Sequence, residues 1–220
     1  MRSLIAWSLE MSGSGLLKSA PLLSKLPAGT RIYVPALPND PPSAIEEALG
    51  LLRRENPGLV PVPHIAASRE ESVRSLESRL AAWQRVSADS VREVLVVRGD
   101  PRGAHATDDS SAASSAASSG PFRTSLDLLE SGALQRCGVE AVSLCGHPEG
   151  IAAAGLSADA ARAHLRAKLQ CADATGVRAR VVSHNNGGSH PADPSADLFT
   201  CPASYRSFSR CSASYRRRFS

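Results

Sequence analysis

Two apolar runs of this sequence stop at turns that carry charged and titratable side chains. One run ends in Arg98, Gly99 and Asp100, and a second is followed by His147 and Glu149. Continuous runs of Val and Leu bounded by Gly and Pro are typical of strands buried on both faces. Ligands of α/β proteins are held just past the carboxyl ends of parallel strands. The two turns therefore predict one shared ligand site.

Three other side chains could take part in chemistry. Glu10 ends the first strand-like run, where a carboxylate can serve as a general acid if burial favours its protonated form; the alternative is a solvated loop glutamate. His64 also sits at a strand end, as a ligand-binding or a purely structural histidine. Lys168 lies on an amphipathic helical pattern, where a solvated lysine is the simpler interpretation. Arg98 and Asp100 could likewise pair only with each other.

Other common site chemistries are not indicated by the sequence. The five cysteines are odd in number and include no CxxC pair, which favours neither a disulfide framework nor a zinc site. No histidine has ligand spacing with another histidine or a cysteine, so we expect no metal site. The chain also lacks a nucleophile elbow and a P-loop.

Strand-like and helix-like segments alternate along most of the chain. The predicted strands are 3–9, 31–36, 60–66, 93–98, 140–145 and 178–183, and the predicted helices are 15–26, 42–54, 69–86, 124–134 and 157–175. Alternation at intervals of about thirty residues predicts βαβ units around a parallel sheet, an α/β fold. Six such units fit an incomplete (β/α)8 TIM barrel or a doubly wound sheet. The missing GxGxxG fingerprint at the first strand–helix junction disfavours a dinucleotide-binding Rossmann fold.

Two helix starts have the spacing of a capping box. Ser43 is followed three residues later by Glu46, and Ser68 by Glu71. In a capping box the two side chains bond to each other's backbone N–H groups at the first helical turn. We therefore expect these serines to begin the second and third helices.

The composition divides the chain into a body and a tail. Residues 1–183 form the predicted domain, with a low-complexity insertion at 106–120, and 184–220 form a disordered Ser/Arg-rich tail. The net charge of +4 comes from five arginines after residue 203, and the rest of the chain has 20 basic and 21 acidic residues. The body thus gives no electrostatic reason to expect nucleic-acid binding, although the tail could form an arm for an acidic partner.

Targeting and membrane signals are also absent from the sequence pattern. No apolar stretch has the length of a membrane span, and the first residues lack the h-region and cleavage site of a signal peptide. We expect a cytoplasmic protein that does not bind membranes and that could form a homo-oligomer.

Several of these segments, taken together, resemble the methylenetetrahydrofolate reductase family, in its shorter bacterial-style branch. Five segments match in order, namely Ser8–Glu10, Val62–Ala67, Leu95–Pro101, Thr124–Glu130 and Gly146–Gly150. They are similar to the family's first-, third- and fourth-strand motifs, an intervening helix and the fifth-strand motif. The resemblance covers roughly residues 1–183.

The resemblance implies a flavoprotein that reduces 5,10-methylenetetrahydrofolate to 5-methyltetrahydrofolate. FAD would be the cofactor, NADH or NADPH the electron donor, and a folate the substrate. The catalytic residues would be Glu10, as the acid, and Asp100, which would tune the flavin. The residues implied to hold the cofactor are His64, Arg98, Gly99, Asp100, His147, Glu149 and Lys168.

The chain also departs from the family pattern. Ile151-Ala152 stands where the family has His-Pro, and the sixth strand is not followed by the usual Gln and aromatic run. The seventh and eighth strand–helix units have no counterpart, so the barrel is expected to be truncated after the sixth strand. We interpret the sequence after Ser183 as an out-of-frame or mis-spliced tail. An inactive barrel fragment, acting at most as a binding module, is the alternative to an enzyme.

Overall fold

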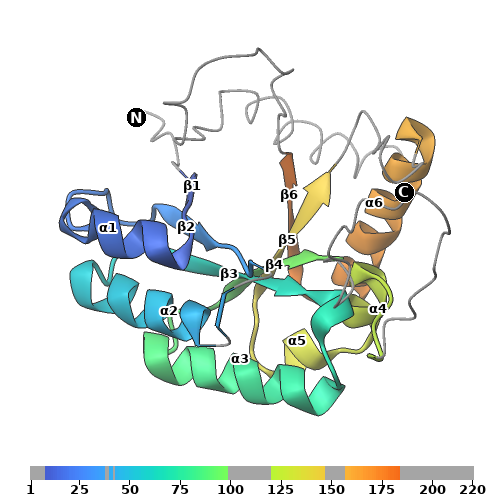
Figure 1. The fold of residues 1–220 in the computed structure, drawn as a ribbon. Coiled ribbons are helices and arrows are strands. Elements are labelled where there is room, and N and C mark those ends of the chain that lie inside the picture. Colours follow the sequence, from blue (N-terminus) through green and yellow to red (C-terminus); the bar gives the residue numbers. More distant parts are fainter. Residues whose placement is uncertain (1–7, 38–39, 42, 99–119, 147–156, 184–220) are drawn as a thin grey trace, which may run out of the picture. The chain divides into compact units, whose positions relative to one another are not determined.

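Six parallel strands form one sheet in the order in which they occur in the chain (Figure 1). The computed structural model describes residues 8–37, 40–41, 43–98, 120–146 and 157–183, all within one compact unit, Met1–His184. The strands are β1 (Ser8–Glu10), β2 (Arg31–Val34), β3 (Val60–Ala66), β4 (Glu93–Val97), β5 (Ala141–Gly146) and β6 (Arg178–Ser183). Each strand pairs in parallel with the next, which is the order that successive βα units produce when each is added at the same edge.

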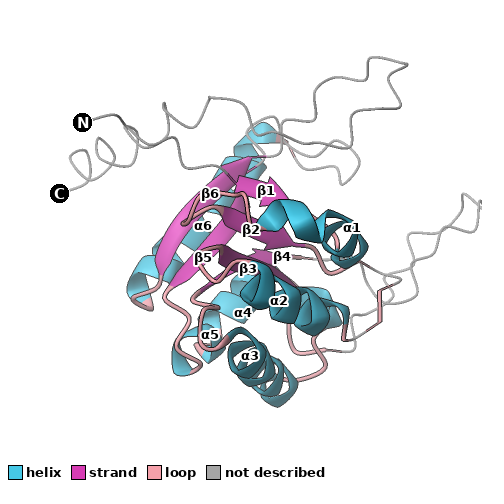
Figure 2. Cartoon of the chain, turned by 90° about the vertical axis from the view of Figure 1, so that its left-hand side faces the viewer, coloured by secondary structure: helices cyan, strands magenta, loops and turns pink. Residues whose placement is uncertain are grey.

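Helices connect the strands and pack against one face of the sheet. They are α1 (Gly13–Leu23), α2 (Ala44–Glu55), α3 (Val73–Ser87), α4 (Ser125–Glu130), α5 (Ala133–Arg136) and α6 (Ala158–Ala174), with a 3-10 turn η1 (Ala67–Arg69) after β3. Figure 2 shows them around the outer side of the strands. Within the described residues, the apolar contacts of the opposite, inner face come from strand residues alone.

The alternation of side chains along each strand separates two apolar clusters. Ile32, Val94 and Leu144 belong to the large core beneath the helices. Tyr33 and Leu95, each the next residue along its strand, belong to the small inner cluster. Successive strand residues point to opposite faces, so the continuous apolar runs seen in the sequence serve both clusters at once.

The structure confirms the predicted α/β class and the parallel sheet. The strand predictions agree with the observed strands to within a few residues, except that only Ser8 and Leu9 of the predicted 3–9 strand lie among the described residues. The sequential strand order, with helices packed against one face, is not that of a doubly wound sheet. Residues 106–119 of the low-complexity insertion and the whole tail, 184–220, lie outside the described residues.

The predicted capping boxes are wrong at both positions. Ser43 does precede α2, but its side chain makes no cap bond and instead donates to Oε1 of Glu47 at 2.7 Å. Helix α3 begins after Ser72 rather than near Ser68, and Ser72 and Ser75 exchange the two capping-box hydrogen bonds. The spacing rule failed at Ser68 because η1 occupies the residues directly after β3.

The predicted helix 124–134 is two short helices. Gly132, between α4 and α5, has a φ of +68°, a left-handed conformation that favours glycine and interrupts a right-handed helix. The apolar pattern continues across the break because Leu129 and Leu134 both reach the core.

We expect Leu80→Ala to lower the free energy of unfolding by about 2–5 kcal/mol, because Leu80 on α3 is fully buried in the large core and its loss leaves a cavity. Urea denaturation measures the change. Leu17→Ala on α1 is the matched control, since Leu17 is 62% exposed and should shift stability by no more than about 0.5 kcal/mol. Equal effects of the two changes would contradict the assignment of the core.

Candidate functional site

The inner face of the sheet carries two of the predicted site residues, Glu10 and His64. The register places Glu10 beside Tyr33, and His64 beside Leu95, so these side chains share a face. Tyr33, Val62 and Leu95 form the buried part of this face, flanked by Val60, Val97, Cys145 and Val182. Polar groups flank this apolar layer in two places, near the amino-terminal ends of the strands and near their carboxyl-terminal ends. The two groups differ in composition.

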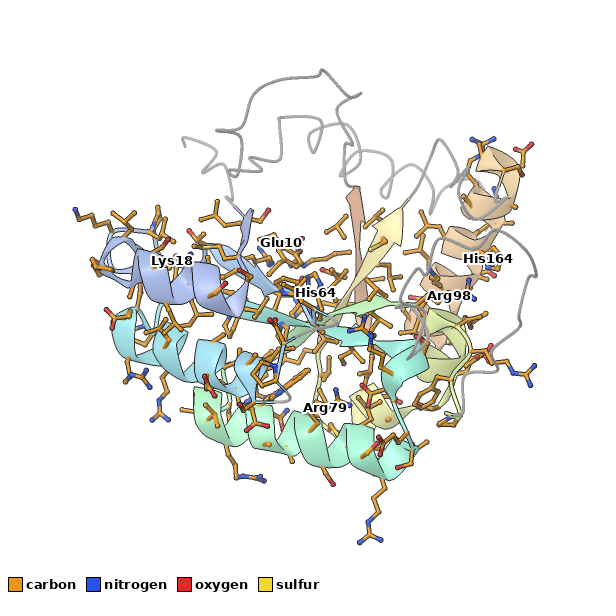
Figure 3. All side chains as sticks on the ribbon, in the orientation of Figure 1. Glu10, Lys18, His64, Arg79, Arg98 and His164 are labelled. Carbon is orange, nitrogen blue, oxygen red and sulfur yellow. The ribbon has the colours of Figure 1, made fainter. Side chains whose placement is uncertain are left out.

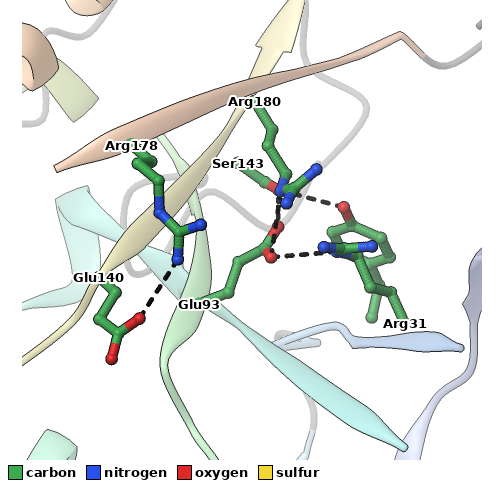
Figure 4. A network of polar contacts seen from close by, with 7 residues as sticks. Arg31, Glu93, Glu140, Ser143, Arg178 and Arg180 are labelled. Atoms are coloured by element: carbon green, nitrogen blue, oxygen red, sulfur yellow. Dashed lines mark hydrogen bonds and ion pairs between the residues drawn. The ribbon is translucent and has the colours of Figure 1, made fainter. Parts of the chain in front are cut away.

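Near the amino-terminal ends of the strands, two arginines share one buried carboxylate. Glu93, at the start of β4, is 4% exposed. Its Oε2 lies 3.0 Å from Nε of Arg31 on β2 and 3.3 Å from Nε of Arg180 on β6 (Figure 4). A buried carboxylate is costly unless it is paired with a cation. Here the two cations come from strands on either side of β4.

This contact requires the sheet to be strongly curled. Strands β2 and β6 are separated by three others, which would set them about 19 Å apart in a flat sheet. Because both Nε atoms approach the same oxygen, they must lie within about 6 Å of each other. The arginines thus reach toward each other across a concave inner face, which we call the concave face from here on.

A hydrogen-bonded chain continues from Glu93 to the aromatic layer. The Ser143 hydroxyl donates to Oε1 of Glu93 at 2.8 Å, and the Tyr33 hydroxyl lies 3.1 Å from Oγ of Ser143. Both Ser143 and Tyr33 are buried. Together with the two arginines, this chain joins β2, β4, β5 and β6 through side chains alone.

Glu10 is the last residue of β1, and His64 lies two residues before the end of β3, so both are toward the carboxyl-terminal side of the concave face (Figure 3). The His64 ring is 8% exposed and meets the Tyr33 ring edge-on, with centroids 6.2 Å apart and planes at 70°. Glu10 is exposed. The burial that would make Glu10 a poised acid is therefore not provided by the described residues.

Cys145 and Lys168 join the same region electrostatically. Burial raises the pKa of the Cys145 thiol, an effect that Lys168 opposes and Glu10 reinforces. Burial also lowers the pKa of the Lys168 ammonium, with partial compensation from Cys145. Lys168 is thus half-buried rather than a fully solvated lysine.

Arg98 follows β4 and is exposed, while its backbone is anchored. Its carbonyl accepts a hydrogen bond from the Ser68 backbone N–H at 2.8 Å. Next to Ser68, Arg69 donates from Nη1 to the Ala36 carbonyl at 3.1 Å. These two bonds tie together the segments that leave β2, β3 and β4, the edge at which the ligand site was predicted.

Four predicted site residues lie outside the described residues, namely Gly99, Asp100, His147 and Glu149. Across the described ranges, no three His, Cys, Asp or Glu side chains come close enough to hold a metal ion. No helix in that same part of the chain has both the length and the apolar character to cross a bilayer.

Comparison with protein families and with curated sequences identifies no relative. No family model matches the chain, and no curated protein matches its sequence. The functional interpretation therefore depends on the motifs and on the geometry of the concave face.

Sequence reasoning missed the network around Glu93. A glutamate at the start of an apolar run was available as a signal, as was the Arg-Ala-Arg alternation at 178–180, which sets both arginines on one face of β6. Arg178 pairs with the exposed Glu140 at 3.2 Å, whereas Arg180 reaches the buried Glu93. The spacing indicates a shared face but not the partner, which lies 87 residues earlier in the chain.

We expect Glu93→Ala to lower the free energy of unfolding by about 3–5 kcal/mol, because it leaves Arg31 and Arg180 facing each other without a carboxylate. Chemical denaturation measures the loss. Glu77→Ala is the control, because Glu77 pairs with an exposed arginine, Arg136, and such pairs are worth at most about 1 kcal/mol. A loss at Glu93 no larger than the loss at Glu77 would show that the buried cluster does not stabilise the fold.

We expect Lys168→Met to stabilise the protein at neutral pH and to lose that advantage as the pH rises. Burial lowers the pKa of Lys168 in the folded state, so its charged form opposes folding below that pKa. Between the folded pKa and the unfolded value of about 10.4, the unfolded state holds more protons, and wild-type stability rises with pH. Urea titrations from neutral to alkaline pH test this.

Lys18→Met, at an exposed position on α1, controls for the loss of a surface charge. A stability difference between wild type and Lys168→Met that stays constant over the whole pH range would contradict the assigned pKa direction.

Proposed function

We propose that the concave face binds a flavin and that the chain is a methylenetetrahydrofolate reductase-like flavoprotein, built on part of a (β/α)8 barrel. The observation that carries the proposal is the convergence of Glu10, His64 and Cys145 on one face, from three strands widely spaced in the sequence. Glu10 and His64 lie in segments that resemble motifs of the reductase family, and Cys145 directly precedes the segment that resembles its fifth-strand motif. The curled parallel sheet has the strand order that such a barrel requires.

The side chains present fit the chemistry of FAD. The partly buried side chains that flank Val62 and Leu95, among them Val97 and Val182, would offer an apolar surface for the isoalloxazine ring. Lys168 and Arg98 supply cations for the diphosphate, and His64 supplies a buried ring nitrogen for a polar edge of the cofactor. Gly99, Asp100, His147 and Glu149 complete the proposed set from the loops after β4 and β5.

Bound FAD would supply hydride transfer between a nicotinamide and the folate. The protein's part is to orient both reactants and to provide a proton. Glu10, at the carboxyl end of β1, is the proposed donor to a ring nitrogen of 5,10-methylenetetrahydrofolate, which opens the five-membered ring for reduction. Glu10 is exposed without a ligand, so the substrate itself would have to exclude water from its carboxyl group.

A second candidate is a barrel fragment without activity, which could still act as a binding module. Within the described residues, β1 and β6 each pair on one side only. A closed eight-stranded barrel needs two further strands between them, and unpaired strand edges expose backbone N–H and C=O groups. This observation favours a protein that needs more chain, or a partner, for its activity.

Flavin binding by the full chain decides between the two candidates. We expect the purified protein to take up FAD, to show flavin absorbance, and to be bleached by NADH or NADPH. Glu10→Gln should retain FAD and its reduction by the nicotinamide but lose folate reduction by at least about a hundredfold, the usual scale for a lost general acid. Lys168→Met should weaken FAD binding several-fold.

Lys18→Met serves as the matched control and should leave FAD affinity unchanged, because Lys18 lies exposed on the helical side of the sheet. A folded wild-type protein that takes up no FAD would refute the flavoprotein and favour the fragment. Flavin binding without folate reduction would instead support an incomplete enzyme.

A further inference from the structure

The hydrogen-bonded chain of Tyr33, Ser143 and Glu93 runs in one direction, from donor to acceptor. Ser143 has one hydroxyl proton, and it is donated to Glu93, which as a carboxylate can only accept. The Tyr33 hydroxyl must therefore donate to Oγ of Ser143. The phenol is thus the outermost donor of a chain that ends on the carboxylate held by Arg31 and Arg180.

This chain fixes the Tyr33 ring from across the concave face. Tyr33 belongs to β2, whereas Ser143 belongs to β5, three strands away in the sheet. The ring itself is 7% exposed and packs against Val62 and Leu95. Packing limits where the ring lies, and the hydroxyl bond to β5 sets its tilt.

The tilt of Tyr33 matters because its ring borders His64. The two rings meet edge to face at 6.2 Å, within the range over which aromatic rings orient one another. A side chain that contacts a ligand directly must be held to within about 10–20° of the orientation in which it binds. Tyr33 lies where it can impose that limit on the His64 imidazole.

We infer that Tyr33 is a positioning residue that orients His64 through its hydroxyl bond to Ser143. The effect on cofactor affinity rests on the proposed flavin function, whereas the effect on the His64 ring does not. Ser143 reaches His64 only indirectly, because Leu95 lies between them in register, paired with His64 on one side and with Ser143 on the other.

A double-mutant cycle tests the inference. In flavin-free protein, the His64 ring signals in NMR spectra should shift in Tyr33→Phe and in Ser143→Ala. Adding Ser143→Ala to Tyr33→Phe should shift them no further, because the bond is already broken. In FAD titrations we expect each single variant to bind about fivefold more weakly, and the double variant also about fivefold more weakly, the scale of one hydrogen bond.

Ser75→Ala is the control for general destabilisation. It removes the bond that the Ser72 backbone N–H donates to Oγ of Ser75 at the start of α3, and it should lower the melting temperature while leaving FAD affinity and the His64 signals unchanged. Circular dichroism checks that each variant is folded, and Tyr33→Phe alone carries the test if Ser143→Ala does not fold.

The inference is overturned if Tyr33→Phe leaves the His64 signals of folded protein unchanged, or if the double variant shows the sum of two independent shifts. Wild-type protein that binds no FAD refutes the proposed function alone, since the NMR cycle on flavin-free protein still decides whether Tyr33 orients His64.

Discussion

The carboxylate of Glu93 links distant strands across the concave face. It is buried at the start of β4, and it pairs with an arginine from β2 on one side and an arginine from β6 on the other. A charge removed from water must keep its partners close, so these pairs require the strands that supply them to lie in an arc. The concave face, the edge-on contact of Tyr33 with His64 and the convergence of Glu10 with Cys145 all follow from that arc.

The two faces of the sheet stabilise the protein in different ways. Beneath the helices, the packing is apolar and depends on shape, as around Trp83 and Leu80. On the concave face, hydrogen bonds link Tyr33 to Ser143 and Ser143 to Glu93, so these side chains are held by directional contacts. The proposed function uses the second face, where orientation is controlled by hydrogen bonds rather than by volume.

Local patterns were sufficient to predict the strands, the parallel sheet and the position of His64, because alternation and apolar runs are properties of neighbouring residues. Three features could not be predicted in this way. The start of α3 depends on η1, which is set by how the chain leaves β3. The exposure of Glu10 depends on which elements surround β1. The pairing of Glu93 with Arg180 depends on curvature, which arises only when all six strands are assembled.

The shared carboxylate also limits how this sequence can change over generations. Glu93, Arg31 and Arg180 could be replaced together by apolar side chains of similar volume with little effect on folding, because buried ion clusters are often no better than good packing. Replacing Glu93 alone leaves two like charges facing each other, and replacing either arginine alone leaves the buried carboxylate with one cation instead of two. Every route of single substitutions to the apolar alternative therefore passes through a less stable intermediate, and descendants of this chain are expected to keep all three residues or to lose them as a group.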